Sequence, residues 1–277
     1  MADTPPTVQQ ALARAAALGL DRTDARLWLG HLLQRDRAWL IAHDDAHLTP
    51  DQAAAFDAGY RQRADGVPMA YLLGEREFHG LALRVTPDVL VPRPDTETLV
   101  DWALALLPGL GAAPRVADLG TGSGAIALAV AHRHPAARVT ATDLSPAALA
   151  VARGNAQRLG LAVAFAEGAW WAALPADARY ELVLSNPPYI AGDDPHLPAL
   201  RHEPALALTP GGDGLDALRA IVAGAPAHLA PGGWLLLEHG WDQAGAVAAL
   251  LREAGFTDVQ HRHDLGGHAR CTGGRLP

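Results

Sequence analysis

From residue 115 onward, short apolar runs alternate with amphipathic segments of helical period, and this alternation constrains the fold more than any other feature. Strands that alternate with helices form mostly parallel sheets covered on both faces. The runs read as strands are 115–119, 138–142, 163–166, 180–184, 234–238, 258–262 and 269–273. The sequence therefore predicts an α/β fold, whose ligands bind at the carboxyl ends of the parallel strands.

The stretch Asn186-Pro187-Pro188-Tyr189 follows the apolar run 180–184 and one serine, so it lies at such a strand end. Two consecutive prolines give a stiff backbone with few N–H donors. The side-chain oxygen of Asn186 and the carbonyl of Pro187 are placed to accept both hydrogens of one NH2 group, which the ring of Tyr189 can cover. This arrangement suits group transfer to a weakly nucleophilic nitrogen. A proline-rich surface turn is the alternative.

A glycine-rich turn follows the strand 115–119 and opens a helix. Its residues are Gly120, Thr121, Gly122, Ser123 and Gly124. Such a turn lets the backbone approach a ligand closely and presents amide N–H groups to it. Asp143, at the end of the next strand, is placed to accept hydrogen bonds from the two hydroxyls of a ribose. Together these features predict a cofactor of the adenosine type.

The turn alone leaves NAD and S-adenosylmethionine open. Gly120-x-Gly122-x-x-Ala125 satisfies the dinucleotide fingerprint, and the spacing to Asp143 fits it equally. Asp118 gives the acidic-x-Gly-x-Gly-x-Gly form seen at the methionine end of S-adenosylmethionine sites. Acceptors for an NH2 group serve N-methylation and are useless for hydride transfer. These two features favour S-adenosylmethionine.

The first third of the chain is expected to be helical. Two capping boxes, one begun by Thr7 and the other by Thr49 before Pro50, predict helix starts. An apolar stripe after Asp21 has the spacing of a further amphipathic helix. No catalytic constellation occurs here, so partner recognition and structural support are both open.

Between these helices and the α/β part, Glu75–Phe78 and Leu81–Val85 flank His79-Gly80, which predicts a β-hairpin with a two-residue turn. A proline-punctuated segment then leads into an amphipathic helix. We therefore expect three parts: a helical domain over 1–73, a hairpin linker over 74–92 and a catalytic domain over 93–277.

Taken together, these motifs resemble those of class I S-adenosylmethionine-dependent N-methyltransferases. More narrowly, the chain is similar over nearly its whole length to the bacterial peptide chain release factor glutamine methyltransferases. The stretches that carry the resemblance are 71–78, 91–97, 120–124, 185–189, 203–208 and 236–240. Arg93–Glu97 discriminates most, because related methyltransferases of a ribosomal-protein glutamine carry a different stretch there. Adenine methyltransferases lack the helical N-terminal domain.

The resemblance implies a seven-stranded Rossmann-like methyltransferase sheet with an antiparallel last strand, a small helical domain for substrate recognition and a hairpin linker. It implies methyl transfer to the side-chain amide of the glutamine in the Gly-Gly-Gln loop of class 1 release factors. The implied cofactor-binding residues are Gly120, Thr121, Gly122, Ser123, Gly124, Asp143, Trp170 and Asn186. The implied substrate-binding residues are Asn186, Pro187, Pro188 and Tyr189, of which Asn186 and Pro187 are catalytic.

The sequence departs from the family after the third strand of the α/β part. The family usually has Asp-Trp near the adenine, whereas this chain has Gly168-Ala169-Trp170-Trp171. The acidic partner is therefore absent, and either Trp170 or Trp171 could stack on the adenine.

Bulk properties limit the alternatives. A net charge of −8 argues against a broad surface for stable nucleic-acid binding. No apolar stretch has the length of about 20 residues that a membrane span needs. The single cysteine, Cys271, and the lack of a signal-peptide pattern predict a cytoplasmic enzyme, and a monomer is expected. Methylation of a ribosomal-protein glutamine or of adenine N6 in nucleic acid, and a catalytically silent cofactor-binding module, remain as rival functions.

Some polar residues have no assigned role. His132–His134 and His261–His263 lack the cysteine or carboxylate cluster of a metal site, so a structural role is favoured and no metal is expected. Glu97 and Glu203 could position substrate or seal the loop 190–214, and they could equally be capping or ion-pair residues. The glycines near the end of this loop indicate a turn first, and a movable lid as a further hypothesis.

Overall fold

The computed structural model describes residues 5–277 and consists of two compact units, Met1–Glu75 and Arg76–Pro277. Each unit has its own hydrophobic core, as separately folding domains do. All of the β-hairpin except its first residue belongs to the larger unit.

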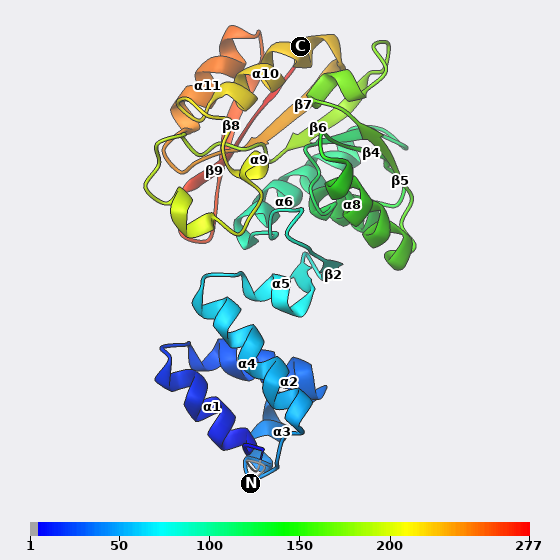
Figure 1. Ribbon diagram of the computed structural model, residues 1–277. Coiled ribbons are helices and arrows are strands. Elements are labelled where there is room, and N and C mark those ends of the chain that lie inside the picture. Colours follow the sequence, from blue (N-terminus) through cyan, green and yellow to red (C-terminus); the bar gives the residue numbers. More distant parts are fainter. Residues whose placement is uncertain (1–4) are drawn as a thin grey trace. The chain divides into compact units, whose positions relative to one another are not determined.

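Within residues 5–75 the regular elements are helices, apart from the first residue of the hairpin, and one isolated antiparallel bridge joins Thr7 to His47 (Figure 1). The helices are α1 (Val8–Ala17), α2 (Arg22–Leu33), α3 (Arg37–Ala42), α4 (Pro50–Ala64) and α5 (Met69–Leu73). Thr7 and Thr49 make complete capping boxes, and the Asp21 carboxylate caps α2, which confirms the three expected helix starts. The sequence did not reveal α3 and α5, because five or six residues are too few to show a helical period.

Apolar side chains of α1, α2 and α4 form the core of this unit. Val8, Leu29 and Phe56 are fully buried in it. The ring of Trp28 lies so close to α4 that a Cβ atom on Gly59 would come within 2.3 Å of it. The Trp28 Nε1 donates a hydrogen bond to the carbonyl of Phe56 at 3.3 Å, which fixes α2 against α4.

The larger unit begins with the expected hairpin of β1 (Glu75–Phe78) and β2 (Leu81–Arg84). Its two turn residues, His79 and Gly80, both have positive φ, at 50° and 82°. This is the geometry of a type I′ turn, whose twist matches that of the paired strands. Phe78 is buried in the core of the larger unit, so the hairpin packs onto that unit.

A sheet of seven strands forms the centre of the larger unit, in the order β5-β4-β3-β6-β7-β9-β8. The strands are β3 (Arg115–Leu119), β4 (Arg138–Asp143), β5 (Val163–Glu167), β6 (Tyr180–Ser185), β7 (Leu229–Glu238), β8 (Thr257–His263) and β9 (Ala269–Arg275). The first five pair in parallel, and β9 runs antiparallel to both β7 and β8. The predicted α/β fold with an antiparallel last strand is therefore confirmed.

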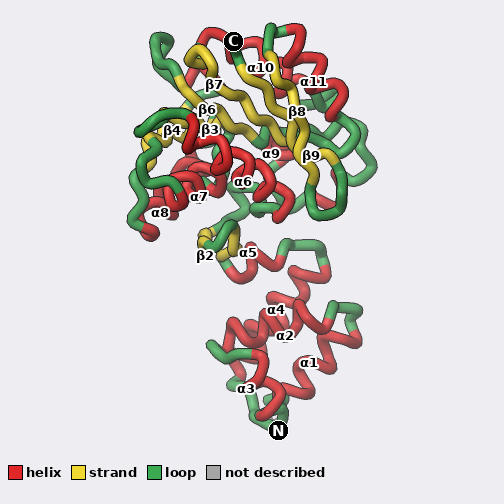
Figure 2. The backbone as a smooth tube through the Cα atoms, turned by 180° about the vertical axis from the view of Figure 1, so that it is seen from behind, coloured by secondary structure: helices red, strands yellow, loops and turns green. Residues whose placement is uncertain are grey.

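Helices cover both faces of this sheet, with α6, α7 and α8 on one face and α10 and α11 on the other (Figure 2). The helices are α6 (Glu97–Leu106), α7 (Ala125–Arg133), α8 (Pro146–Leu159), α9 (Ala205–Leu208), α10 (Asp216–Gly224) and α11 (Ala244–Glu253). Short 3-10 turns occur at Pro94–Thr96, Leu107–Gly109, Trp170–Ala173, Leu197–Leu200 and Ala225–Ala227.

The central strands are buried on both faces, which explains their continuous apolar runs. In β6, Leu182 and Leu184 pack against the helices of one face, and Val183 packs against those of the other. In β7 the same alternation separates Leu236 from Leu235. Because the side-chain period of a strand is two, each run supplies both cores at once.

One strand is longer than expected. The sequence predicts a turn at 231–233 followed by a strand over 234–238, whereas β7 begins at Leu229. Tyr180 pairs with Leu229 and Leu182 pairs with Trp234, so residues 230–233 stand opposite Glu181 alone. The turn is thus an irregularity inside the strand, a form of β-bulge that an isolated Pro-Gly-Gly pattern does not reveal.

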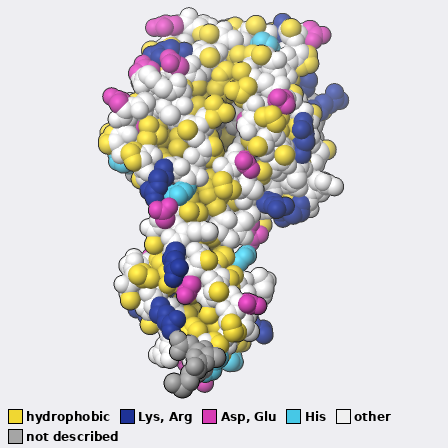
Figure 3. All heavy atoms as spheres, viewed as in Figure 1, with side chains coloured by type: hydrophobic (Ala, Val, Ile, Leu, Met, Phe, Trp, Pro, Cys, Tyr) yellow, Lys and Arg dark blue, Asp and Glu magenta, His cyan; other side chains and the backbone are white. Residues whose placement is uncertain are grey.

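Arginine and acidic side chains are scattered over the face that Figure 3 shows, without a continuous basic area on it. This distribution agrees with the net charge of −8. Residues 5–277 contain no helix with the length and apolar character needed to cross a membrane.

Two helical glycines of the larger unit predict opposite effects of the same substitution. A Cβ atom on Gly224 would lie 2.2 Å from the Trp171 ring, whereas none of the described residues lies within 4 Å of one on Gly154. Gly224→Ala should therefore lower the free energy of unfolding by about 1–3 kcal/mol through overpacking. Gly154→Ala should raise it by about 0.5–1 kcal/mol through helix propensity. Calorimetric unfolding of the full chain checks both, and shifts of the same sign would contradict this account of the packing.

Candidate active site

The pairing of three neighbouring strands brings the predicted site residues to one edge of the sheet. Leu119 at the end of β3 is in register with Thr142 of β4 and with Ser185 of β6. The segments that follow these strands therefore begin side by side. They line a cavity of about 420 Å³, a volume typical of small-molecule sites.

Most of the predicted residues line this cavity. Those that do so are Gly120, Thr121, Gly122, Ser123, Asp143, Trp170, Asn186 and Pro188. Gly124, Pro187 and Tyr189 are not among the lining residues. Gly124 has a packing role instead, because a Cβ atom there would lie 2.9 Å from Leu128 of α7.

The glycine turn uses its own amide groups internally. The N–H groups of Gly120 and Thr121 both donate to the carbonyl of Thr142, at 2.9 and 2.8 Å. The N–H of Gly122 donates to Asp143 Oδ2 at 2.9 Å. The expectation that the turn presents its amides to a ligand is therefore wrong for these three groups. Positive φ values of 76° at Gly120 and 56° at Gly122 shape the turn into a wall of the cavity.

Asp118 lies buried beneath this turn. Its Oδ2 accepts hydrogen bonds from the Thr121 hydroxyl at 2.6 Å and from the N–H of Ala127, in the first turn of α7, at 3.2 Å. Its Oδ1 is buried and has no hydrogen-bond partner among residues 5–277. Burial raises the pKa of this carboxyl to about 7.

Asp143 is placed at the end of β4 with both carboxylate oxygens partly used. Oδ2 accepts from the N–H of Gly122, and Oδ1 accepts from the N–H of Ser145 at 2.9 Å. Each oxygen keeps a further lone pair, because a carboxylate offers about four acceptor sites. Asp143 can therefore hold the turn and still accept from the hydroxyls of a ligand.

The two neighbouring tryptophans have different environments. Trp171 is a core residue: its Nε1 donates to the carbonyl of Ile221 at 2.9 Å, and its ring stacks on His228 with centroids 4.8 Å apart. Trp170 has a φ of 49° and lines the cavity, where its ring faces Gly120. Of the two, Trp170 is the one available to a ligand.

Asn186 is half-buried and lines the cavity directly after β6. Its Nδ2 donates a hydrogen bond to the Thr96 hydroxyl at 3.2 Å. The preceding Ser185 donates its hydroxyl to the carbonyl of Leu119 at 2.6 Å, which ties the end of β6 to the end of β3. The backbone that carries Asn186 is therefore anchored to the glycine turn.

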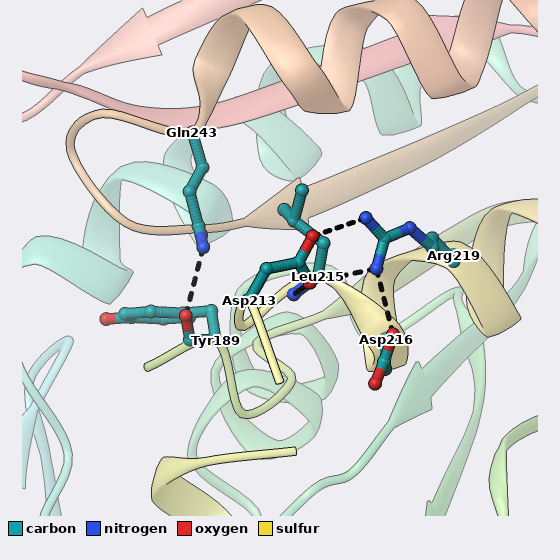
Figure 4. A network of polar contacts seen from close by, with 6 residues as sticks. All are labelled: Tyr189, Asp213, Leu215, Asp216, Arg219 and Gln243. Atoms are coloured by element: carbon teal, nitrogen blue, oxygen red, sulfur yellow. Dashed lines mark hydrogen bonds and ion pairs between the residues drawn. The ribbon is translucent and has the colours of Figure 1, made fainter. Parts of the chain in front are cut away.

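The backbone of Tyr189 contacts Gln243, as Figure 4 shows, and packs closely against Gly214. Its carbonyl accepts a hydrogen bond from Gln243 Nε2 at 3.0 Å. A Cβ atom on Gly214, which has a φ of 80°, would lie 2.3 Å from the same carbonyl oxygen, so only glycine fits there. Burial raises the pKa of the Tyr189 hydroxyl, so it stays protonated.

The loop next to Gly214 is fixed by an ion-pair cluster, also drawn in Figure 4. Arg219 of α10 pairs with Asp213 at 2.5 Å and with Asp216 at 2.8 Å. Asp213 also accepts from the N–H of Leu215 at 3.0 Å. These contacts join the turn around Gly214 to the start of α10.

Two glutamates left open by the sequence have defined contacts. Glu203 is buried, accepts from the N–H of Val91 at 3.1 Å and pairs with Arg93, so it closes the loop 190–214 onto the segment before α6. Glu97 accepts from the N–H of His79 at 3.0 Å and holds the hairpin turn. Residues 5–277 contain no group of three or more His, Cys, Asp or Glu side chains suited to a metal ion.

Sequence reasoning missed several apolar walls of the cavity. Leu144 and Leu206 line it and are 52% and 57% exposed, although both are large and hydrophobic. Leu144 directly follows Asp143, so its position could have been found from the strand end. Leu206 comes from α9, which is only four residues long and gives no periodic signal.

Solved structures of methyltransferases share the fold of the larger unit. A methyltransferase from Pyrococcus furiosus has a TM-score of 0.53 at 19% identity and covers 71% of this chain and 89% of its own. The Thermus thermophilus 16S rRNA N2 G1207 methyltransferase, in complex with AdoMet and guanosine, has a TM-score of 0.56 at 20% identity. It covers 73% of this chain and 50% of its own.

Comparisons of sequence are more specific. Residues 7–74 match the PrmC N-terminal domain family, and residues 100–241 match the methyltransferase small domain family. The release factor glutamine methyltransferase of Bordetella pertussis is 58% identical over 93% of this chain and 96% of its own length. The enzymes of that name from Xylella fastidiosa and Burkholderia pseudomallei are 53% and 50% identical, over 96% and 100% of this chain and 98% and 100% of their own lengths. The chain belongs to the release factor glutamine methyltransferase family.

Proposed function

We propose that this protein transfers a methyl group from S-adenosylmethionine to the side-chain amide nitrogen of the glutamine in the Gly-Gly-Gln loop of class 1 release factors. One observation carries the proposal. Asn186 and Pro188, which follow β6, line the same cavity as the glycine turn and Asp143, which follow β3 and β4. Asn186, the side-chain acceptor for an NH2 group, thus shares one cavity with a site for an adenosine-type cofactor.

The donors and acceptors of the turn favour S-adenosylmethionine over a dinucleotide. A pyrophosphate needs free amide N–H groups at a helix start. Here the amides of Gly120, Thr121 and Gly122 already have internal acceptors, and Asp118 accepts from the N–H of Ala127 in the first turn of α7. Asp118 does not line the cavity, but its negative charge beneath the turn, when ionised, would repel a phosphate above the turn and attract an ammonium group. The amino group of a methionine moiety supplies such a cation.

The chain's own residues would position the substrate. S-adenosylmethionine supplies an electrophilic methyl group. The lone pair of an amide nitrogen is delocalised, so two acceptors that hold both N–H groups favour the geometry in which this lone pair is directed at an electrophile. Asn186 Oδ1 and the carbonyl of Pro187 are the acceptors that we assign. Because the nitrogen loses its proton after transfer, the site needs no strong general base.

The choice of substrate rests on the relatives and on their shared domains. The proteins at 50% to 58% identity are named for the methylation of a release factor glutamine, and the helical N-terminal unit matches a family of its own. The discriminating stretch Arg93–Glu97 contributes Arg93 and Thr96 to the cavity. Buried Cys271 is a free thiol, which fits a cytoplasmic enzyme.

Methyl transfer to a purified release factor tests the proposal. Label from S-adenosylmethionine should appear on the normal factor and be absent from a factor whose Gly-Gly-Gln glutamine is replaced by alanine. Label on both factors would place the reaction at another residue. Label on neither, with cofactor binding intact, would contradict the proposal and point to a ribosomal protein or to nucleic acid.

Removal of the side-chain acceptor should separate chemistry from binding. Asn186→Ala should slow single-turnover methyl transfer by about a hundredfold or more, the effect of losing one directed group in an enclosed site. The dissociation constant of S-adenosylmethionine, measured by calorimetry, should change far less. An unchanged rate in this variant would exclude Asn186 as the acceptor.

A change at Asp143 should affect the affinity for the cofactor rather than the rate of methyl transfer. Asp143→Ala should weaken the binding of S-adenosylmethionine by about tenfold to a hundredfold, because a charged acceptor and the support of the turn are both lost. Glu167→Ala is the matched control: Glu167 is in register with Asp143 at the end of β5, is exposed and does not line the cavity. Equal dissociation constants for the two variants would show that the ribose assignment is wrong.

A further inference from the structure

Glu238 is a buried carboxylate next to the site without lining it. It is the last residue of β7 and is 1% exposed. Leu237 is in register with Ser185, so Glu238 comes alongside Asn186 at the edge of the sheet. Neither the glycine turn nor the cavity surface includes it. A charged group in such a place needs a physical reason, because its burial is unfavourable.

The polar partners of Glu238 are the two residues that connect it to the cavity. The Thr96 hydroxyl and the Asn186 amide lie beside its carboxylate and lower its pKa as hydrogen-bond donors, and Asn186 Nδ2 donates to the Thr96 hydroxyl at 3.2 Å. Within residues 5–277, Oε2 of Glu238 has no partner. Thr96 and Asn186 line the cavity, so the carboxylate contacts the site only through them.

The direction of these hydrogen bonds determines how the Asn186 amide is turned. An ionised carboxylate can only accept, so a Thr96 hydroxyl that bonds to Glu238 gives its single hydrogen to it. That hydroxyl is then left as an acceptor, and the group that Asn186 offers to it must be its NH2. One N–H group of the Asn186 amide is thus used by Thr96, and its NH2 end lies beside the Glu238 carboxylate. Oδ1 is the end of the amide that remains for a substrate.

We propose that Glu238 is a positioning residue, which acts with Thr96 to turn the Asn186 amide so that its oxygen accepts from the substrate NH2 group. This inference rests on the proposed function and goes beyond it, because it assigns a role to a residue that no substrate touches. Without the carboxylate, the Thr96 hydroxyl can donate to Asn186, and the amide can turn over. Its NH2 would then face the NH2 of the substrate, and the acceptor would be lost.

The ionisation of Glu238 supports this role. Burial is the main cause that raises the pKa of this carboxyl to about 7, and the charge of Asp95 raises it further. Hydrogen bonding by Thr96 and Asn186 and the charge of Arg270 lower the pKa by less. Tyr189 and Cys271 also interact electrostatically with Glu238. Burial raises the pKa of both groups, so both stay protonated and neutral. A protonated Glu238 could donate to Thr96 and reverse the hydrogen bonds. The turnover rate should therefore fall as the pH drops through about 7.

Kinetics of methyl transfer to a release factor test the inference. Glu238→Gln keeps the shape and removes the obligatory acceptor, and Thr96→Val removes the hydroxyl that connects the two residues. Each variant should lower kcat about tenfold or more at saturating S-adenosylmethionine. The dissociation constant of S-adenosylmethionine should stay within about twofold of the wild-type value. The double variant should be no slower than the slower single variant, because both changes break one relay. Thr96→Ser should restore most of the rate.

The pH profile separates positioning from mere stability. Asp118 also has a pKa of about 7, so the profile is taken at saturating cofactor, where kcat reports the bound enzyme. The wild-type kcat should decline below pH 7, and this limb should be absent in Glu238→Gln. Glu181→Gln is the matched control. Glu181 accepts from the N–H of Arg115 at 2.6 Å and lies near the start of β6, at the other end of the strand from the site. The kcat of this variant should equal that of the wild type.

The outcomes decide separately on the two proposals. A wild-type enzyme that methylates neither form of the factor overturns the proposed function and, with it, the inference. An active wild type overturns the inference alone if Glu238→Gln and Thr96→Val keep normal kcat values, if their effects add, or if Thr96→Ser is as slow as Thr96→Val. Should Glu238→Gln fail to fold, the two threonine variants decide by themselves.

Discussion

The site depends on the pairing of β3 with β4 on one side and with β6 on the other. This register places the glycine turn, Asp143 and Asn186 at neighbouring positions, although Asn186 lies far from the other two in the sequence. The hydrogen bond from the Ser185 hydroxyl to the carbonyl of Leu119 holds the two strand ends together. A one-residue slip would turn every side chain of the slipped strand to the opposite face, so the buried alternation of the strands also protects the geometry of the site.

Polar groups near the cavity are largely used by the protein itself. Asp118 and Asp143 hold the glycine turn and the start of α7, and Glu203 holds the segment before α6 through the N–H of Val91. What remains for a ligand is a small set of acceptors, chiefly Oδ1 of Asn186 and the further lone pairs of Asp143. The polar atoms that have no internal hydrogen-bond partner therefore determine which ligand groups the site can bind.

The sequence predicted the elements that have a strong local period or a clear terminus, among them the capping boxes, the hairpin turn at His79-Gly80 and all seven strands. It could place Asn186 and Asp143 at a strand edge because a parallel sheet has only one such edge for ligands. It could not give the internal use of the turn amides, which depends on the register with Thr142. Glu238 ends β7 next to the position where Asn186 follows β6, so the same reasoning, applied to β7, would have found it.

Two of the buried carboxyls, those with a raised pKa, also affect the folding equilibrium. Asp118 and Glu238 both have a raised pKa in the folded chain, so folding favours their protonated forms. The stability that each contributes is present below the unfolded pKa of about 4 and is lost as the pH rises through about 7. Near pH 7 both carboxyls are therefore partly ionised, at the expense of the stability of the free enzyme. A cation bound in the cavity above the glycine turn would favour the ionised form of Asp118, so occupation of the site and stability of the fold are thermodynamically linked.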